Sequence, residues 1–112
     1  MNEELIAELI KFALKKKNEE IINIPSQNGT IKIAILQRGW VVIGRYFDMG
    51  EDIILGDSYV IRRWGTKKGL GQLAIEGKQE ETILDKTGIM RFNKLTTIGF
   101  IDCNYSIWDK EI

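Results

Sequence analysis

The densest group of residues with chemical potential lies at positions 58–73. This stretch holds four basic side chains and no acidic one, although the whole chain carries 16 basic and 16 acidic residues. Arg62 and Arg63 stand next to Trp64, and a glycine-rich segment with two lysines follows. Guanidinium groups bind phosphate and carboxylate oxygens, and aromatic rings stack on bases. The combination predicts a site for a small anionic ligand, such as a nucleotide or a cyclic nucleotide.

Each part of this segment has an expected role in the site. Adjacent residues of a strand point to opposite faces of a sheet, so one of the two arginines is expected to face inward, toward an anion or a carboxylate. Backbone N–H groups of the glycine-rich loop and the following helix start would donate to the ligand. The predicted ligand-binding residues are Tyr59, Arg62, Arg63, Trp64, Thr66, Lys67, Lys68, Gly69 and Gly71. The alternative interpretation is a glycine-rich turn with solvated lysines and a structurally paired arginine.

The sequence of this loop partly matches two known nucleotide-binding motifs but satisfies neither. Residues 69–74 match G-x-G-x-x-A formally, but four residues separate them from the preceding strand and no βαβ unit follows in so short a chain. No Gly-Lys-Ser or Gly-Lys-Thr closes the loop, which argues against a P-loop. A dinucleotide-binding domain of the Rossmann type is therefore not expected.

The composition limits the chemistry that remains. The 112-residue chain has no histidine and a single cysteine, Cys103. Ser-His-Asp and Cys-His catalysis, histidine metal ligands, an internal disulfide and a cysteine zinc cage are thereby excluded. A net charge of zero argues against wrapping of duplex nucleic acid. We predict a non-enzymatic binding protein without cofactor or metal, and we expect Cys103 to be a core residue.

The chain also carries signals that bear on its location. Glu3 and Glu4 precede the first apolar residues, whereas a secretory signal begins with a basic region. No run approaches the roughly 20 apolar residues that cross a bilayer. We expect a cytoplasmic protein without membrane contact.

Two kinds of periodicity predict the elements that position the site. Residues 2–17 have apolar side chains at helical spacing over an arc of about 200°, wide enough to pack on the chain's own sheet or to join a second subunit as a homo-oligomer. Residues 20–112 change to a period of two, and hairpin turns separate the β-branched runs. Residues 53–64 are expected to form one or two strands interrupted near Gly56-Asp57, and a turn is expected at 85–88. Ser106–Trp108 is expected to close the sheet, and Trp40 is expected in the core.

The predicted fold is a single domain, 1–112, of the α+β class. An N-terminal amphipathic helix (2–17) packs on a curled, mostly antiparallel sheet or small barrel of about seven short strands (20–112), with one short helix near 70–76.

The segment Ile61 to Ala74, with the sequence IRRWGTKKGLGQLA, resembles the core of a group of small proteins encoded by phages and prophages. The group has no assigned activity, so the resemblance implies a phage-like origin. Short phage proteins without catalytic residues frequently inhibit host defence. The leading hypothesis is a counter-defence protein that sequesters a nucleotide signal in the host cytoplasm. The alternative is an inhibitor that binds a host defence protein, or a phage structural module, through the sheet or the wide helix face.

Overall fold

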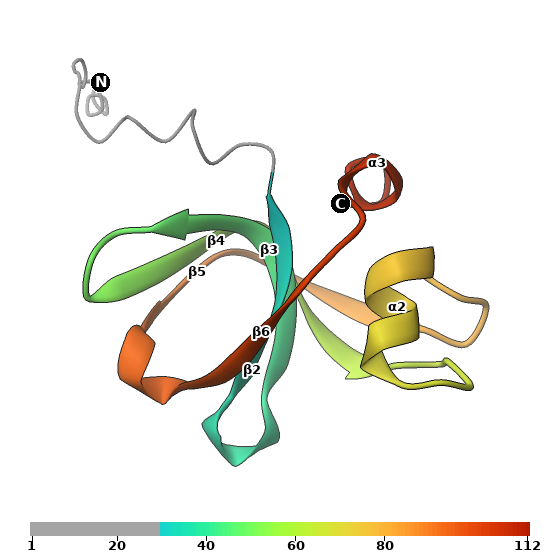
Figure 1. The fold of residues 1–112 in the computed structure, drawn as a ribbon, viewed down its shortest axis with the longest axis horizontal. Helices are drawn as coiled ribbons and strands as arrows, with labels where there is room; N and C mark the ends of the chain where they lie inside the picture. Colours follow the sequence, from blue (N-terminus) through green and yellow to red (C-terminus); the bar gives the residue numbers. More distant parts are fainter. Residues whose placement is uncertain (1–29) are drawn as a thin grey trace.

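The computed structural model describes residues 30–112, which form one five-stranded antiparallel sheet (Figure 1). The strands follow the order β5-β4-β3-β2-β6. Two short α-helices, α2 and α3, lie on one side of the sheet, and two single-turn 3-10 helices, η2 and η3, connect strands. The elements are β2 (Ile31–Leu36), η2 (Gln37–Gly39), β3 (Val41–Asp48), β4 (Asp52–Arg63), α2 (Leu70–Glu76), β5 (Ile83–Asn93), η3 (Lys94–Thr96), β6 (Thr97–Asp102) and α3 (Tyr105–Trp108).

Alternation along the strands places apolar side chains on both faces of the sheet. Ile33 lies opposite Ile43 in the β2–β3 ladder, and the next pair, Ala34 and Val42, points to the other face. The first core lies under α2 and α3, and the second lies within the curl of the sheet. The first core consists of Ile31, Ile33, Ile43, Ile61, Leu70, Leu73, Ala74 and Trp108, and the second of Ala34, Val42, Ile53 and Leu55.

The sheet is strongly curved, because strands from its two ends contribute to the same second core. Phe92 on β5 and Phe100 on β6 both pack against it, although these strands lie at opposite ends of the strand order. Tyr46 meets Phe100 edge-on, with ring centroids 5.4 Å apart. The two ends of the sheet must bend toward each other to reach one cluster. The sheet is therefore curled while its outer strands stay unpaired with each other.

The C-terminal helix is fixed to this frame by one tryptophan and one arginine. Trp108 is fully buried, and its Nε1–H donates to the carbonyl of Leu73 on α2 at 3.0 Å. Arg45 on β3 contacts the carboxylates of Asp57, at 3.0 Å, and Asp109, at 2.8 Å. Burial lowers the pKa of Arg45, but the hydrogen bonds to these two carboxylates outweigh burial and raise the pKa above its ordinary value.

The structure corrects the predicted fold class in the number of strands. Residues 30–112 form five strands. The turn expected at 85–88 lies inside β5, residues 53–63 belong to the single strand β4, and 106–108 are helical. At Gly56-Asp57 the β3–β4 pairing shifts register, and Asp57 has a φ of 46°. A bulge at this point bends β4 without ending it. Gly44 faces the bend, since a Cβ there would lie 2.9 Å from the Gly56 carbonyl oxygen.

The turn expected at 85–88 is part of a strand. β5 continues through it, and the β4–β5 pairing absorbs the change by register shifts around Ser58. Ser106–Trp108 belongs to helix α3 rather than to a closing strand. Trp40, expected in the core, is 55% exposed. The short helix predicted near 70–76 is present as α2, whereas the helix predicted at 2–17 lies outside the described residues.

None of the helices in the described part of the chain is long and apolar enough to cross a bilayer.

The buried tryptophan gives a direct test of what holds α3 in place. We expect Trp108→Ala to lower the free energy of unfolding by about 3–5 kcal/mol, because it empties a core position and leaves the Leu73 carbonyl without its donor. The matched control, Trp40→Ala, removes the same side chain from an exposed position and is expected to cost about 1 kcal/mol at most. Urea unfolding followed by circular dichroism measures both. Equal losses in the two variants would contradict this packing.

Candidate functional site

The two adjacent arginines lie at the end of β4, and both are exposed. Arg62 makes a forked contact with Asp85 on β5, with its Nε 2.7 Å and its Nη2 3.4 Å from the two carboxylate oxygens. The hydrogen bond to Asp85 raises the pKa of Arg62. Arg63 lies 3.5 Å from Glu81. The expectation that one arginine faces inward is therefore wrong, and each guanidinium already has a carboxylate partner.

The backbone N–H groups predicted to hold an anion are bound by a side chain of α2. The amide oxygen of Gln72 accepts from the N–H of Lys67 at 3.1 Å and from the N–H of Lys68 at 2.8 Å. The Gln72 side-chain nitrogen in turn donates to Glu76 at 3.0 Å. A neutral oxygen thus occupies the position that the prediction gave to a ligand, and the loop is closed onto its own helix.

The loop after β4 crosses the segment before β5 at close range. Gly65 has a φ of 69°, and a Cβ on it would lie 2.3 Å from the carbonyl carbon of Glu81, so only glycine fits. Thr82 is buried at the crossing, where its hydroxyl donates to the Trp64 carbonyl at 2.7 Å and accepts from the Gln79 N–H at 2.9 Å. These contacts join the two loops into one frame.

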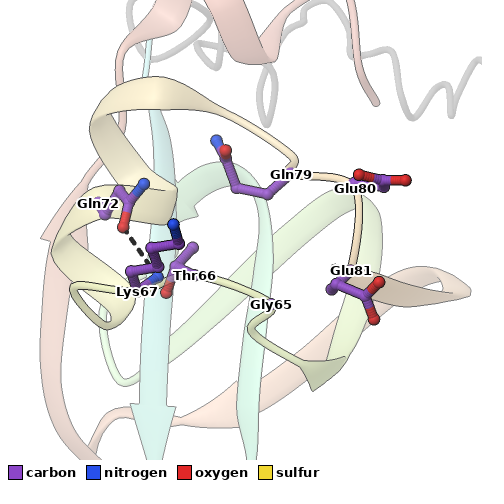
Figure 2. A pocket seen from close by; sticks show the side chains of 7 residues that line it. All are labelled: Gly65, Thr66, Lys67, Gln72, Gln79, Glu80 and Glu81. Atoms are coloured by element: carbon purple, nitrogen blue, oxygen red, sulfur yellow. Dashed lines mark hydrogen bonds between the residues drawn. The ribbon is translucent and has the colours of Figure 1, made fainter.

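An open cavity of about 350 Å³ lies between the two loops. In Figure 2, Thr66, Lys67 and Gln72 lie on one side, Glu80 and Glu81 lie on the other, and Gln79 lies between them. The Thr66 hydroxyl donates to the Gly69 carbonyl at 2.7 Å, which fixes the near wall. Gly65 completes the lining. The cavity is therefore lined by polar and charged residues of both signs, and apolar parts of their side chains share the exposed lining.

Only part of the predicted site meets at this cavity. Of the nine predicted residues, Thr66 and Lys67 line it. Tyr59 instead packs against the first core, and Trp64 is 43% exposed beside Gly69. The others lie on the surrounding strand end, loop and helix start: Arg62, Arg63, Lys68, Gly69 and Gly71.

The remaining lining residues are ones that the predicted site did not include: Gln72, Gln79, Glu80 and Glu81. The pair at 80–81 has the composition of a solubility turn, and a glutamine carries no charge to mark it. Gly65 is the one sequence feature that bears on the cavity. Its position requires a glycine because the backbone of the segment before β5 passes against it.

Within residues 30–112 no group of three or more acidic or cysteine side chains is arranged to hold a metal ion. A second hollow, of about 410 Å³, lies between the β3–β4 turn and η3, where it is lined by Gly50, Glu51, Asn93, Lys94 and Leu95.

Comparison with known proteins finds a likeness in solved structures only. No family model and no curated protein matches the chain. A heptameric archaeal Sm protein superposes with a TM-score of 0.46 at 16% identity, over 72% of this chain and 96% of that one. The SmAP1 heptamer of P. aerophilum gives 0.45 at 17% identity, over 72% and 88%. A likeness at this level assigns no family, ligand or activity to the chain. The resemblance of residues 61–74 to phage proteins stays a prediction.

The closed state of the loop can be tested through Gln72. We expect Gln72→Ala to speed amide hydrogen exchange at Lys67 and Lys68 by roughly two- to tenfold, because both N–H groups lose their acceptor. Glu76→Ala is the matched control, since it removes the partner of the Gln72 nitrogen and leaves the oxygen in place. NMR-detected exchange measures both variants. Unchanged protection in Gln72→Ala would show that the loop is held by other contacts.

The single cysteine lies apart from this cavity and packs beside the first core. Burial raises the pKa of the Cys103 thiol to about 12. The thiolate is the reactive form, so the folded protein has on the order of a thousandfold less of it at neutral pH than an unfolded chain with a pKa of about 8.5. Cys103 is therefore a packing residue, as the sequence indicated.

We expect iodoacetamide to alkylate Cys103 slowly at pH 8 and rapidly once guanidinium unfolds the chain. The raised pKa also has a consequence for stability. Above pH 8.5 the unfolded state loses the thiol proton while the folded state keeps it, so stability falls with rising pH until about pH 12. Cys103→Ala should remove this contribution to the pH profile. Equal alkylation rates in folded and unfolded protein would contradict burial of the thiol.

Proposed function

We propose that the domain is a non-enzymatic interaction module that assembles through the open edges of its sheet, with a second copy of the chain as its partner. The observation that supports this proposal is the strand order, in which β5 and β6 stand at the two ends. Each has one neighbouring strand, and no strand among residues 30–112 pairs with its outer side. Unpaired N–H and C=O groups along a strand are a template for another strand.

The side chains near these edges favour contact with protein rather than with water. Ile89 on β5 is 78% exposed, Ile98 on β6 is 69% exposed, and Leu95 on the connecting η3 is 85% exposed. Single exposed apolar residues are common on protein surfaces. These three residues lie on the two edge strands and on the turn between them, which supports an interface that buries their side chains.

The two edges belong to different strands, and this decides the geometry of assembly. β5 is 11 residues long and β6 is six. Pairing of β5 in one copy with β6 in the next is a head-to-tail contact, which produces a closed ring or an open filament according to the rotation between copies. A single chain thereby carries both halves of the interface. The helix at 2–17, through which a homo-oligomer was also expected, lies outside the described residues. The edge-to-edge arrangement does not require it.

The small-anion hypothesis has less support from the geometry. Asp85 and Glu81 pair with the two arginines, and Gln72 binds the loop N–H groups. A phosphate would have to displace these partners and to approach Glu80 and Glu81. Sequestration of a nucleotide and a role in counter-defence remain predictions from the sequence, and edge-to-edge assembly is the better-supported reading.

Edge substitutions test the proposal. We expect the unmodified protein to be an oligomer by native mass spectrometry and light scattering. Ile98→Lys and Ile89→Lys should each shift it toward monomer, because a charged side chain on an edge strand opposes strand pairing. Dispersed amide NMR spectra would confirm that both variants fold.

The matched control is Ile75→Lys on α2, a 63% exposed isoleucine that lies on neither edge. We expect its oligomeric state to equal that of the unmodified protein. A monomeric unmodified protein at high concentration would overturn the proposal, and so would edge variants that assemble as before.

A further inference from the structure

The two edge strands are regular over only part of their length. On β6, residues 99–102 pair with β2 without a break, and a register shift interrupts the ladder just before them. On β5, residues 84–86 and 90–93 each pair with β4 without a break, and register shifts separate these two runs. A bulge disrupts the regular spacing of N–H and C=O groups along a strand. The regular part of the β6 edge is therefore 99–102, and β5 offers two runs that could receive it.

Charge distinguishes the two runs of β5. In the run 84–86 two of the three residues are charged, Asp85 and Lys86, and Lys86 is exposed. Charged side chains on an edge strand, lysine above all, oppose pairing with another strand. The run 90–93 has one charged residue, Arg91, whose guanidinium already has a carboxylate partner on β4. The run 90–93 is therefore the better receiver of a second copy.

The two faces of the sheet restrict how the runs can meet. Phe92 and Phe100 both pack against the second core, so they lie on the same face of the sheet. Side chains alternate between faces, and a slip of one residue would set Phe92 beside a residue of the opposite face in the next copy. The strand pairs of the described sheet are all antiparallel. Among antiparallel registers that keep the second-core faces together, one alone overlaps all four residues of both runs.

We infer that residues 90–93 of one copy pair antiparallel with residues 99–102 of the next. This pairing rests on the edge-to-edge assembly proposed above and names the residues that form the contact. It places Phe92 directly beside Phe100 of the next copy. Both rings are half-buried within one copy, and aromatic pairs across neighbouring strands are stabilising. The second core of one copy is thereby continuous with the second core of the next.

The same register gives a place to the two exposed isoleucines of the edges. Ile89 comes just before the run 90–93, and Ile98 comes just before the run 99–102. Because the runs are antiparallel, these two side chains lie at opposite ends of the paired stretch. Each covers one end of the ladder, where the backbone hydrogen bonds would otherwise be open to water.

Disulfide cross-linking of co-expressed variants tests this register, in a Cys103→Ala background that removes the one native cysteine. Asn93 lies directly opposite Gly99 of the next copy, and Cα atoms of opposite residues are about 4.5–5.5 Å apart, within disulfide reach. A Cβ at Gly99 meets no atom within 4 Å, so a cysteine has space there. We expect Asn93→Cys and Gly99→Cys to cross-link on oxidation when co-expressed. Neither should cross-link alone, because a head-to-tail contact never brings the same position of two copies together.

The matched control is Arg91→Cys co-expressed with Gly99→Cys. These positions share a face but are two residues, about 6.8 Å, out of register, which puts their Cα atoms beyond disulfide reach. The yield of cross-linked dimer should therefore fall to that of the single variants. The same Arg91→Cys chain should cross-link with Ile101→Cys, its opposite residue in this register, which shows that position 91 is accessible to oxidation. Non-reducing gels and intact mass spectrometry measure every pair.

Light scattering of the same variants under reducing conditions separates the register from the assembly itself. An oligomer that cross-links through Arg91→Cys with Gly99→Cys, or through none of the pairs, overturns the register and leaves assembly standing. Cross-linking of Asn93→Cys alone also overturns the register, because it requires β5 to pair with β5. A monomeric protein overturns the edge-to-edge assembly and the register with it.

Discussion

The bend in β4 is the constraint on which the rest of the structure depends. Gly56 and Asp57 interrupt the register of β3 and β4 without ending either strand. The space for this bend exists because position 44 has no side chain, and Arg45 on the same strand holds the carboxylate of Asp57 at 3.0 Å. The bend lets one sheet enclose the second core while its other face carries α2 and α3. A flat β4 would place Phe92 and Phe100 too far apart to share a cluster.

The close crossing at Gly65 organises the other end of the molecule. The chain leaves β4 and returns to β5 almost in contact with itself, so the loop, α2 and the returning segment behave as one unit. At this end of the molecule, carboxylates from another part of the sequence lie beside the two arginines. The two arginines belong to exposed ion pairs, and exposed pairs of this kind contribute little to stability. The carboxylates of Asp85 and Glu81 offset the positive charge that the sequence places at Arg62 and Arg63.

The sequence predicts the strands whose neighbours are close in the chain. The alternation of Ile31, Ile33 and Ile35 with other residues indicates the strand at 31–36, and a short helical run bounded by glycine indicates the helix at 70–76. The sequence leaves open whether residues 53–64 form one strand or two, because a bulge and a turn require the same residues at Gly56-Asp57, those that tolerate positive φ. The ion pairs of Arg62 and Arg63 depend on residues that only the β4–β5 register brings near. The role of Gln72 was not readable, because a neutral amide gives no signal until its two N–H partners are placed.

The strand order also has a consequence for how the chain reaches this structure. β2, β3, β4 and β5 pair in the order in which they occur, so each new strand adds to the edge of its predecessor. The pairing of β2 with β6 joins residues about two-thirds of the chain apart, such as Ile33 and Ile101. Closing so long a loop costs conformational entropy before any favourable contact offsets the loss. We therefore expect the four-stranded meander to form first and β6 to dock last, so that the second core becomes dry only when Phe100 arrives.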